Sequence, residues 1–111
     1  ISVLVGGRDE TDIFQNKQKH HSVVNLIGKT DFSDLAYLSS RAKLIIGNDT
    51  GPMHLLVVCS NDKIPKIVLF GGASDPKLCA PIGKNVKIVK ECNINYIKTD
   101  YIKNLINKKK L

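Results

Sequence analysis

The sequence predicts an α/β fold in which a parallel sheet is flanked by helices. Short apolar runs rich in branched residues alternate with longer segments whose apolar residues recur at helical spacing, an order typical of βα units. Glycine follows several of these runs closely, which indicates turns at the carboxyl ends of strands. The expected strands are residues 1–5, 23–27, 43–46, 66–70 and 86–89. The loops after the first four should open at one common edge, where open α/β sheets bind ligands.

The helices between and after these strands can be predicted with their buried faces. A first helix should open within residues 8–12, where acidic side chains favour a helix N-terminus. Residues 32–41 should form a helix capped by Thr30 or Asp31, and its inward-facing residues are expected to be Leu35, Ala36, Leu38 and Ala42. Residues 100–110 should form a terminal helix with Tyr101, Ile102, Leu105 and Ile106 facing inward. The strand at residues 1–5 is expected to be buried.

The stretch from residue 43 to 58 carries most of the chemistry. A strand leads through Asp49, Thr50 and Gly51 into a helix, in which Pro52 fits the first position and Thr50 or Gly51 the N-cap. Several backbone N–H groups should point outward there, with the positive end of the helix dipole behind them, which favours phosphate. His54 lies on the first helical turn. A capped turn that binds nothing explains the same residues, and both interpretations stay open.

Composition limits the classes of partner. The chain of 111 residues is long enough for one domain, and its net charge of +7 comes almost wholly from lysine. A basic face could meet nucleic acid or an anionic membrane surface. Few aromatic residues accompany the lysines, so we expect a solvated surface and no nucleic-acid partner. No apolar run approaches the ~20 residues of a membrane-spanning helix. Because the chain opens in a strand without Met, we expect that upstream sequence has been removed or lost.

Neither the cysteines nor the paired histidines form a metal-binding pattern. Cys59, Cys79 and Cys92 are widely spaced, which favours free thiols in a reducing cytoplasm. His20 and His21 have no carboxylate or thiol at a useful spacing. We therefore predict no metal, no cofactor and a cytoplasmic location.

Residues 40–55 (SRAKLIIGNDTGPMHL) resemble the signature of the family 9 glycosyltransferases, the ADP-heptose:lipopolysaccharide heptosyltransferases. Residues 25–30, 69–71 and 74–76 match in order and approximate spacing, so the likeness extends to Gly83. It corresponds to the C-terminal, nucleotide-sugar-binding half of a two-domain GT-B enzyme. The resemblance implies one Rossmann-like domain over residues 1–111 and an N-terminal acceptor domain that is absent. It also implies heptose transfer from ADP-heptose to a lipopolysaccharide core, with possible peripheral contact at the inner membrane.

The resemblance and the loop chemistry together nominate the residues of a donor site. Thr50 and Gly51 would donate to the diphosphate, and His54 would add a charge-assisted hydrogen bond. Gly51 would also provide any positive φ that the turn needs. Asp49 would accept from a sugar hydroxyl or fix the loop through backbone N–H groups, because two anions repel each other.

Three further residues precede this stretch. Lys29 and Thr30 follow the strand at residues 23–27, and Lys29 could reach a diphosphate or remain a solvated charge. Glu10 lies where the resembling family holds the nucleotide ribose, although an acid at a helix N-terminus needs no function. The catalytic base is expected in the N-terminal half, since Asp75 is better explained as a turn residue before Pro76.

Two departures from the family pattern leave other functions open. Residues 56–58 are bulkier than the small residues usual in that helix, and the exit over residues 59–65 is about three residues longer. One extra residue also precedes Ser74. The alternatives are a non-catalytic nucleotide- or phosphate-binding module, such as a gene remnant, and a nucleic-acid-binding domain favoured only by charge.

Overall fold

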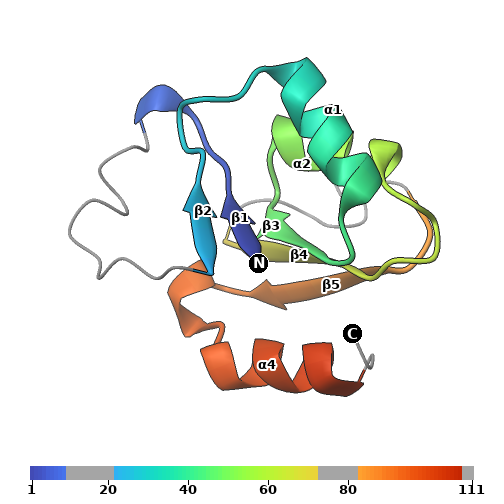
Figure 1. The fold of residues 1–111 in the computed structure, drawn as a ribbon. Helices are drawn as coiled ribbons and strands as arrows, with labels where there is room; N and C mark the ends of the chain where they lie inside the picture. Colours follow the sequence, from blue (N-terminus) through green and yellow to red (C-terminus); the bar gives the residue numbers. More distant parts are fainter. Residues whose placement is uncertain (10–21, 73–82, 109–111) are drawn as a thin grey trace. The chain divides into compact units, whose positions relative to one another are not determined.

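The computed structural model describes residues 1–9, 22–72 and 83–108, and Figure 1 traces these parts of the chain. The chain divides into two compact units, Ile1–Asp34 (unit 1) and Leu35–Leu111 (unit 2), which are described one at a time. The predicted helix near residues 8–12 falls largely outside the described residues. The prediction of one domain over the whole chain stays a prediction.

Unit 1 contains a short parallel sheet. Strand β1 (Ser2–Leu4) pairs with β2 (Val23–Asn25), from Ser2 opposite Val23 to Leu4 opposite Asn25. Parallel pairing was predicted and is confirmed, but both strands are shorter than expected. The prediction that residues 1–5 form a buried strand is wrong: Val3 is 42% exposed, and none of these five residues is buried. Two strands are too few to enclose a core of their own.

Unit 2 contains a three-stranded parallel sheet in the order β3–β4–β5. The strands are β3 (Ile45–Asn48), β4 (Lys66–Gly71) and β5 (Val86–Glu91). The central strand β4 is the most buried, as expected for a strand with a neighbour on both sides. Strand β3 begins two residues later than predicted, and pairing starts where the Ile45 N–H bonds to the Pro65 carbonyl. Each of the two sheets is thus parallel, as the sequence indicates.

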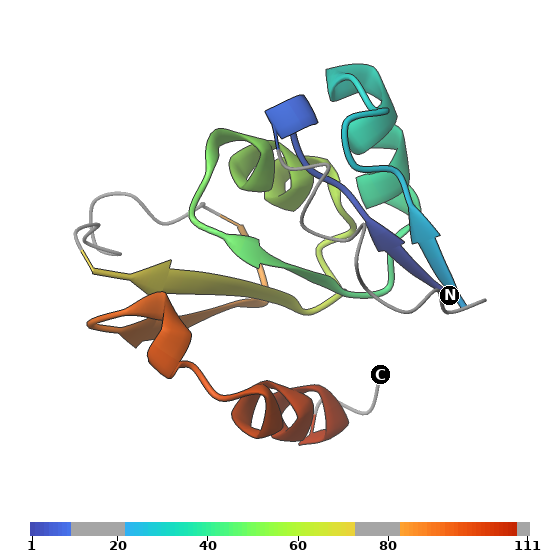
Figure 2. The same cartoon turned by 90° about the vertical axis from the view of Figure 1, so that its left-hand side faces the viewer.

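Helices cover both faces of the unit 2 sheet. Figures 1 and 2 show α2 (Gly51–Cys59) on one face and α4 (Thr99–Lys108) on the other. Helix α1 (Phe32–Arg41) has the predicted bounds, and its Ser39 hydroxyl donates to the Leu56 carbonyl of α2. A short 3-10 helix, η2 (Ile94–Tyr96), was not predicted.

The terminal helix is less buried than its amphipathic pattern suggests. Tyr101 was expected to face inward, yet it is 48% exposed. Ile102, Leu105 and Ile106 are only half-buried. The apolar spacing therefore predicts which face of α4 turns toward the sheet, but not a closely packed layer.

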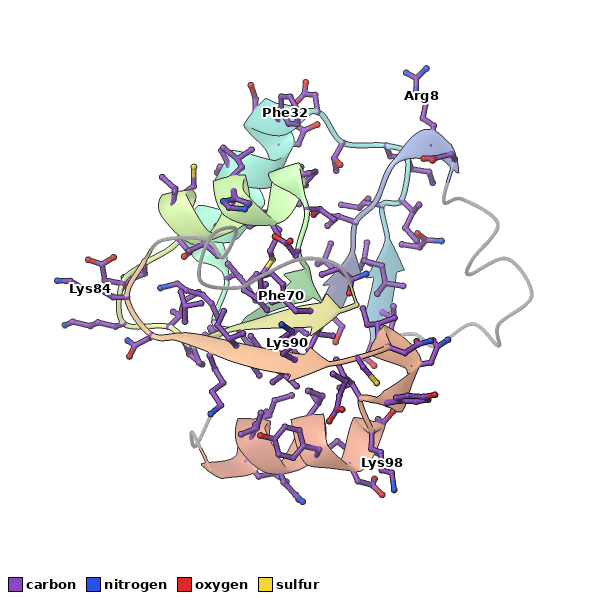
Figure 3. The ribbon with its side chains drawn as sticks, turned by 180° about the vertical axis from the view of Figure 1, so that it is seen from behind. Arg8, Phe32, Phe70, Lys84, Lys90 and Lys98 are labelled. Atoms are coloured by element: carbon purple, nitrogen blue, oxygen red, sulfur yellow. The ribbon has the colours of Figure 1, made fainter. Side chains whose placement is uncertain are left out.

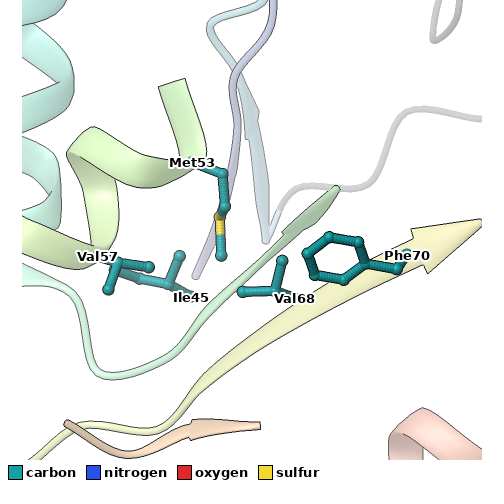
Figure 4. Packing of buried hydrophobic residues seen from close by; sticks show 5 residues of the cluster. All are labelled: Ile45, Met53, Val57, Val68 and Phe70. Carbon is teal, nitrogen blue, oxygen red and sulfur yellow. The ribbon is translucent and has the colours of Figure 1, made fainter. Parts of the chain in front are cut away.

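The core of unit 2 lies between α2 and the sheet (Figure 4). Its buried cluster consists of Ile45, Met53, Val57, Val68 and Phe70. Each such side chain contributes roughly 1.5–3 kcal/mol through removal from water. The bulky helix is accommodated because Val57 is buried while the neighbouring Val58 is 72% exposed. Gly47 leaves room for Met53, whose Sδ atom would lie 2.8 Å from an added Cβ.

A buried lysine anchors the longer exit that follows α2. Lys66, 1% exposed, donates from Nζ to the carbonyls of Asn61, at 2.9 Å, and Lys84, at 2.8 Å. By contrast Lys84, Lys90 and Lys98 are exposed, and Figure 3 marks them on unit 2. The extra residues after α2 are therefore held by specific bonds and do not disturb the packing of the helix on the sheet.

Candidate functional site

The N-terminus of α2 is capped by Thr50. Its Oγ1 accepts from the Met53 N–H at 3.3 Å, and its carbonyl accepts from the His54 N–H at 3.2 Å. Pro52 is the second helical residue, one position later than predicted, and has no N–H. In the described part of the chain, this leaves the N–H groups of Thr50 and Gly51 without a partner. The outward-pointing donors are therefore two, fewer than the sequence suggested.

Asp49 and His54 face each other across this turn. Asp49 Oδ1 lies 3.7 Å from His54 Nε2, and the two side chains are 15% and 45% exposed. The expectation that Asp49 fixes the loop through backbone N–H groups stays a prediction, as does its contact with a sugar hydroxyl.

Gly51 occupies open space. An added Cβ would meet nothing within 4 Å, and Gly51 does not have a positive φ. The turn therefore has no positive φ at this position for Gly51 to provide. A Cβ at Gly51 would instead occupy the space beside the two free N–H groups, where a bound anion would approach.

A second polar region lies within unit 1. A pocket of about 400 Å³ is lined by residues from the ends of both strands and from the start of α1. Those residues are Gly6, Gly7, Arg8, Gly28, Lys29, Thr30, Asp31 and Asp34. The carboxyl ends of β1 and β2 thus share one edge, as predicted for this pair. Arg8, Asp31 and Asp34 were not nominated from the sequence; the Asp-x-x-Asp spacing at a helix start could have indicated the last two.

Most of the nominated residues fall into two separate groups. Asp49, Thr50, Gly51 and His54 gather at the start of α2, and Lys29 and Thr30 line the pocket of unit 1. Glu10, Asp75 and the paired histidines lie outside the described residues. A single site that unites both groups stays a prediction.

Two further sequence predictions can be compared with the described ranges. The expectation of free buried thiols holds only in part: Cys59 and Cys92 are free, but Cys59 is only half-buried and Cys92 is exposed, whereas Cys79 is not among the described residues. No cluster of His, Cys, Asp and Glu that could hold a metal occurs in residues 1–9, 22–72 and 83–108. No helix in those same ranges is long and apolar enough to cross a membrane.

The parallel sheet of unit 2, covered by helices on both faces, defines an α/β fold, in which loops at the carboxyl ends of the strands are the usual place for a ligand. The model of glycosyltransferase family 9 (heptosyltransferase) matches residues 1–109. The chain therefore belongs to glycosyltransferase family 9.

Individual relatives agree with this assignment. Lipooligosaccharide heptosyltransferase 2 of Haemophilus ducreyi is 31% identical over 67 residues, which is 60% of this chain and 19% of that protein. The solved structure of ADP-heptose LPS heptosyltransferase II from E. coli matches with a TM-score of 0.78 at 20% identity. A family 9 glycosyltransferase from Veillonella parvula matches with a TM-score of 0.67 at 24% identity. Both structural matches cover 96% of this chain, and 35% and 29% of the respective solved chains.

Proposed function

We propose that this chain provides the donor-binding half of a glycosyltransferase that transfers heptose from ADP-heptose to a lipopolysaccharide core. The family match over residues 1–109 is the observation that carries the proposal. The chain covers 35% of the solved heptosyltransferase II from E. coli. The acceptor-binding half and the catalytic base would be supplied by a domain corresponding to the remaining length, and the reaction would take place at the cytoplasmic face of a membrane.

The start of α2 would hold the diphosphate of the donor. The N–H groups of Thr50 and Gly51 are free in the described part of the chain, and the Thr50 hydroxyl can donate outward while its oxygen accepts from Met53. His54 would supply the positive charge, since α2 has no acidic residue in its first turn to compete with the ligand. These donors would neutralise a leaving diphosphate without a metal ion.

Asp49 would act on the sugar side of the donor. Its carboxylate is mostly buried and lies 3.7 Å from His54, so it can accept from a sugar hydroxyl while the imidazole offsets its charge. Direct contact between Asp49 and phosphate would place two anions together. The Asp49–His54 pair would therefore orient the bound donor, with its diphosphate at the N-terminus of α2 and its sugar beside the Asp49 carboxylate.

Calorimetric titration with ADP tests this proposal. The folded 111-residue chain should bind ADP, Thr50→Val should weaken binding, and Thr50→Ser should restore it, because serine keeps both the cap and the hydroxyl. Absence of ADP binding by the folded wild-type chain would refute the proposal. Binding of ADP without heptose transfer, measured after an acceptor-binding half is added, would favour the non-catalytic nucleotide-binding module instead.

A further inference from the structure

Strand β5 is the outermost strand of the unit 2 sheet in the part of the chain that the structure describes. It pairs with β4 on one side only (Figure 1). The carbonyls of Asn85 and Glu91 accept from N–H groups at the start of β4 and just past its end, so the odd-numbered residues of β5 bond inward. The N–H and C=O groups of Ile88 and Lys90 therefore point away from the sheet. A row of such groups is a template for another strand.

Two opposite charges share one face of β5. Lys87 and Glu91 are both exposed and lie on either side of Val89, on the face away from α2, since Ile88 packs against the core under that helix. Neither forms an ion pair with another residue that the structure describes. Strand geometry sets the two about 13 Å apart, too far to pair with each other. Both charges are thus available to a partner.

Backbone geometry limits how two copies of β5 can pair antiparallel. Groups that bond across such a pair must face each other, so an even-numbered residue must lie opposite an even-numbered one. One register that meets this condition places Val89 opposite Val89 and Ile88 opposite Lys90. Lys87 of each copy then lies opposite Glu91 of the other, with Cβ atoms about 5 Å apart on the same face. A shift by two residues in either direction removes both opposite-charge pairs.

We propose that a second copy of this chain pairs with β5 in this register and joins the two unit 2 sheets into one. The charge pattern selects a second copy as the partner, because Lys–Val–Glu over alternate residues is complementary to itself when the strand is reversed. A twofold axis through the two Val89 residues makes the contact isologous. One strand pair buries little surface, so the dimer should be reversible.

This inference goes beyond the proposed function and does not depend on it. The paired strands would run in opposite directions, so the carboxyl edges of the two sheets would point away from each other. The start of α2 would then stay accessible in both copies. Dimerisation is therefore expected to leave ADP affinity unchanged.

Sedimentation equilibrium on the 111-residue chain measures the association directly. The wild-type chain should form a reversible dimer that weakens as salt is added, because exposed ion pairs are screened. A chain that stays monomeric up to millimolar concentration would overturn the proposal.

A charge exchange between two variants tests the register. Lys87→Glu places Glu opposite Glu at both pairs, and Glu91→Lys places Lys opposite Lys, so each variant alone should dimerise about tenfold more weakly or worse. Mixed in equal amounts, the two variants should form a heterodimer of wild-type affinity, because every pair again has opposite charges. Dimerisation that survives in either variant alone, or that fails to return on mixing, would count against this register.

The matched control exchanges two exposed charges away from β5. Lys98→Glu and Asp100→Lys change the net charge by the same amounts at the start of α4. Each control variant should dimerise as the wild type does, and mixing should add nothing. If the controls reproduce the loss and recovery of the β5 variants, net charge and not strand pairing drives the association, and the proposal is overturned.

Discussion

Helices α1 and α2 both follow a loop after a parallel strand, yet their N-termini are capped in different ways. At α1, two carboxylates bond to the N–H groups of Asp31 and Asp34 and place negative charge at the helix start. At α2, a threonine hydroxyl satisfies one amide, proline removes another, and no acid occupies the first turn. The same local architecture therefore produces one terminus closed to anions and one open to them. Capping chemistry, and not the strand–loop–helix pattern alone, decides which loop can receive a phosphate.

The largest expected effect comes from filling the open terminus. Gly51→Val should weaken ADP binding by about a hundredfold or more, since the loss of two hydrogen bonds to a charged group is worth roughly 3 kcal/mol. The melting temperature should change little, because an added Cβ meets open space there. Calorimetry and thermal unfolding on the same sample measure both quantities.

Gly47→Ala is the matched control for Gly51→Val. Its Cβ would lie 2.8 Å from Met53 Sδ inside the core, so this change should lower the melting temperature while the donors of Thr50 and Gly51 remain. If Gly51→Val unfolds the chain or leaves ADP affinity intact, the open terminus is not a ligand site.

A smaller effect is expected from the charged side chain beside that terminus. His54→Gln should reduce ADP affinity roughly tenfold, because one charge-assisted hydrogen bond contributes about 1.5–3 kcal/mol and glutamine replaces part of it. Equal affinity of wild type and His54→Gln for ADP, measured by calorimetry under the same conditions, would exclude a contribution of His54 to the site.

The smallest effect concerns the closed terminus. Asp31→Ala removes the N-cap acceptor of α1 and should lower the free energy of unfolding by about 1 kcal/mol, whereas Asp31→Asn should preserve it. Denaturant unfolding measures this difference. Equal stability of Asp31→Ala and wild type would mean that the capping box is not a structural element, and the contrast between the two helices would lose its basis.

Local signals explain what could be predicted from the sequence. The bounds of α1 could be predicted because the capping residues at 31 and 34 and the apolar spacing indicate the same helix. Pro52 and Thr50 likewise indicated where α2 begins, to within one residue. The family signature, in turn, predicted the family that the match over residues 1–109 confirms, while the roles of residues 49–54 stay predictions.

Non-local contacts explain what was missed. The space around Gly51 and the approach of Asp49 to His54 depend on how the loop folds over the helix, which no spacing rule states. The start of β3 depends on pairing with the residues before β4 rather than on apolar content. The burial of Lys66 was not predicted, because lysine is almost never buried unless its ammonium group finds partners, and those partners are distant carbonyls.

Because Lys66 is buried, the rate at which its amine is chemically modified can report how fast the chain unfolds. Among the lysines whose side chains the structure describes, it alone is inaccessible, while the others are open to amine-specific reagents such as acetylating agents. Modification at Lys66 should therefore lag behind that of its neighbour Lys63 in the native chain and catch up in denaturant. Because its Nζ bonds to the segments on both sides of β4, each labelled molecule would record an opening of the sheet at that end. Peptide mass spectrometry could thus time that opening without any engineered probe.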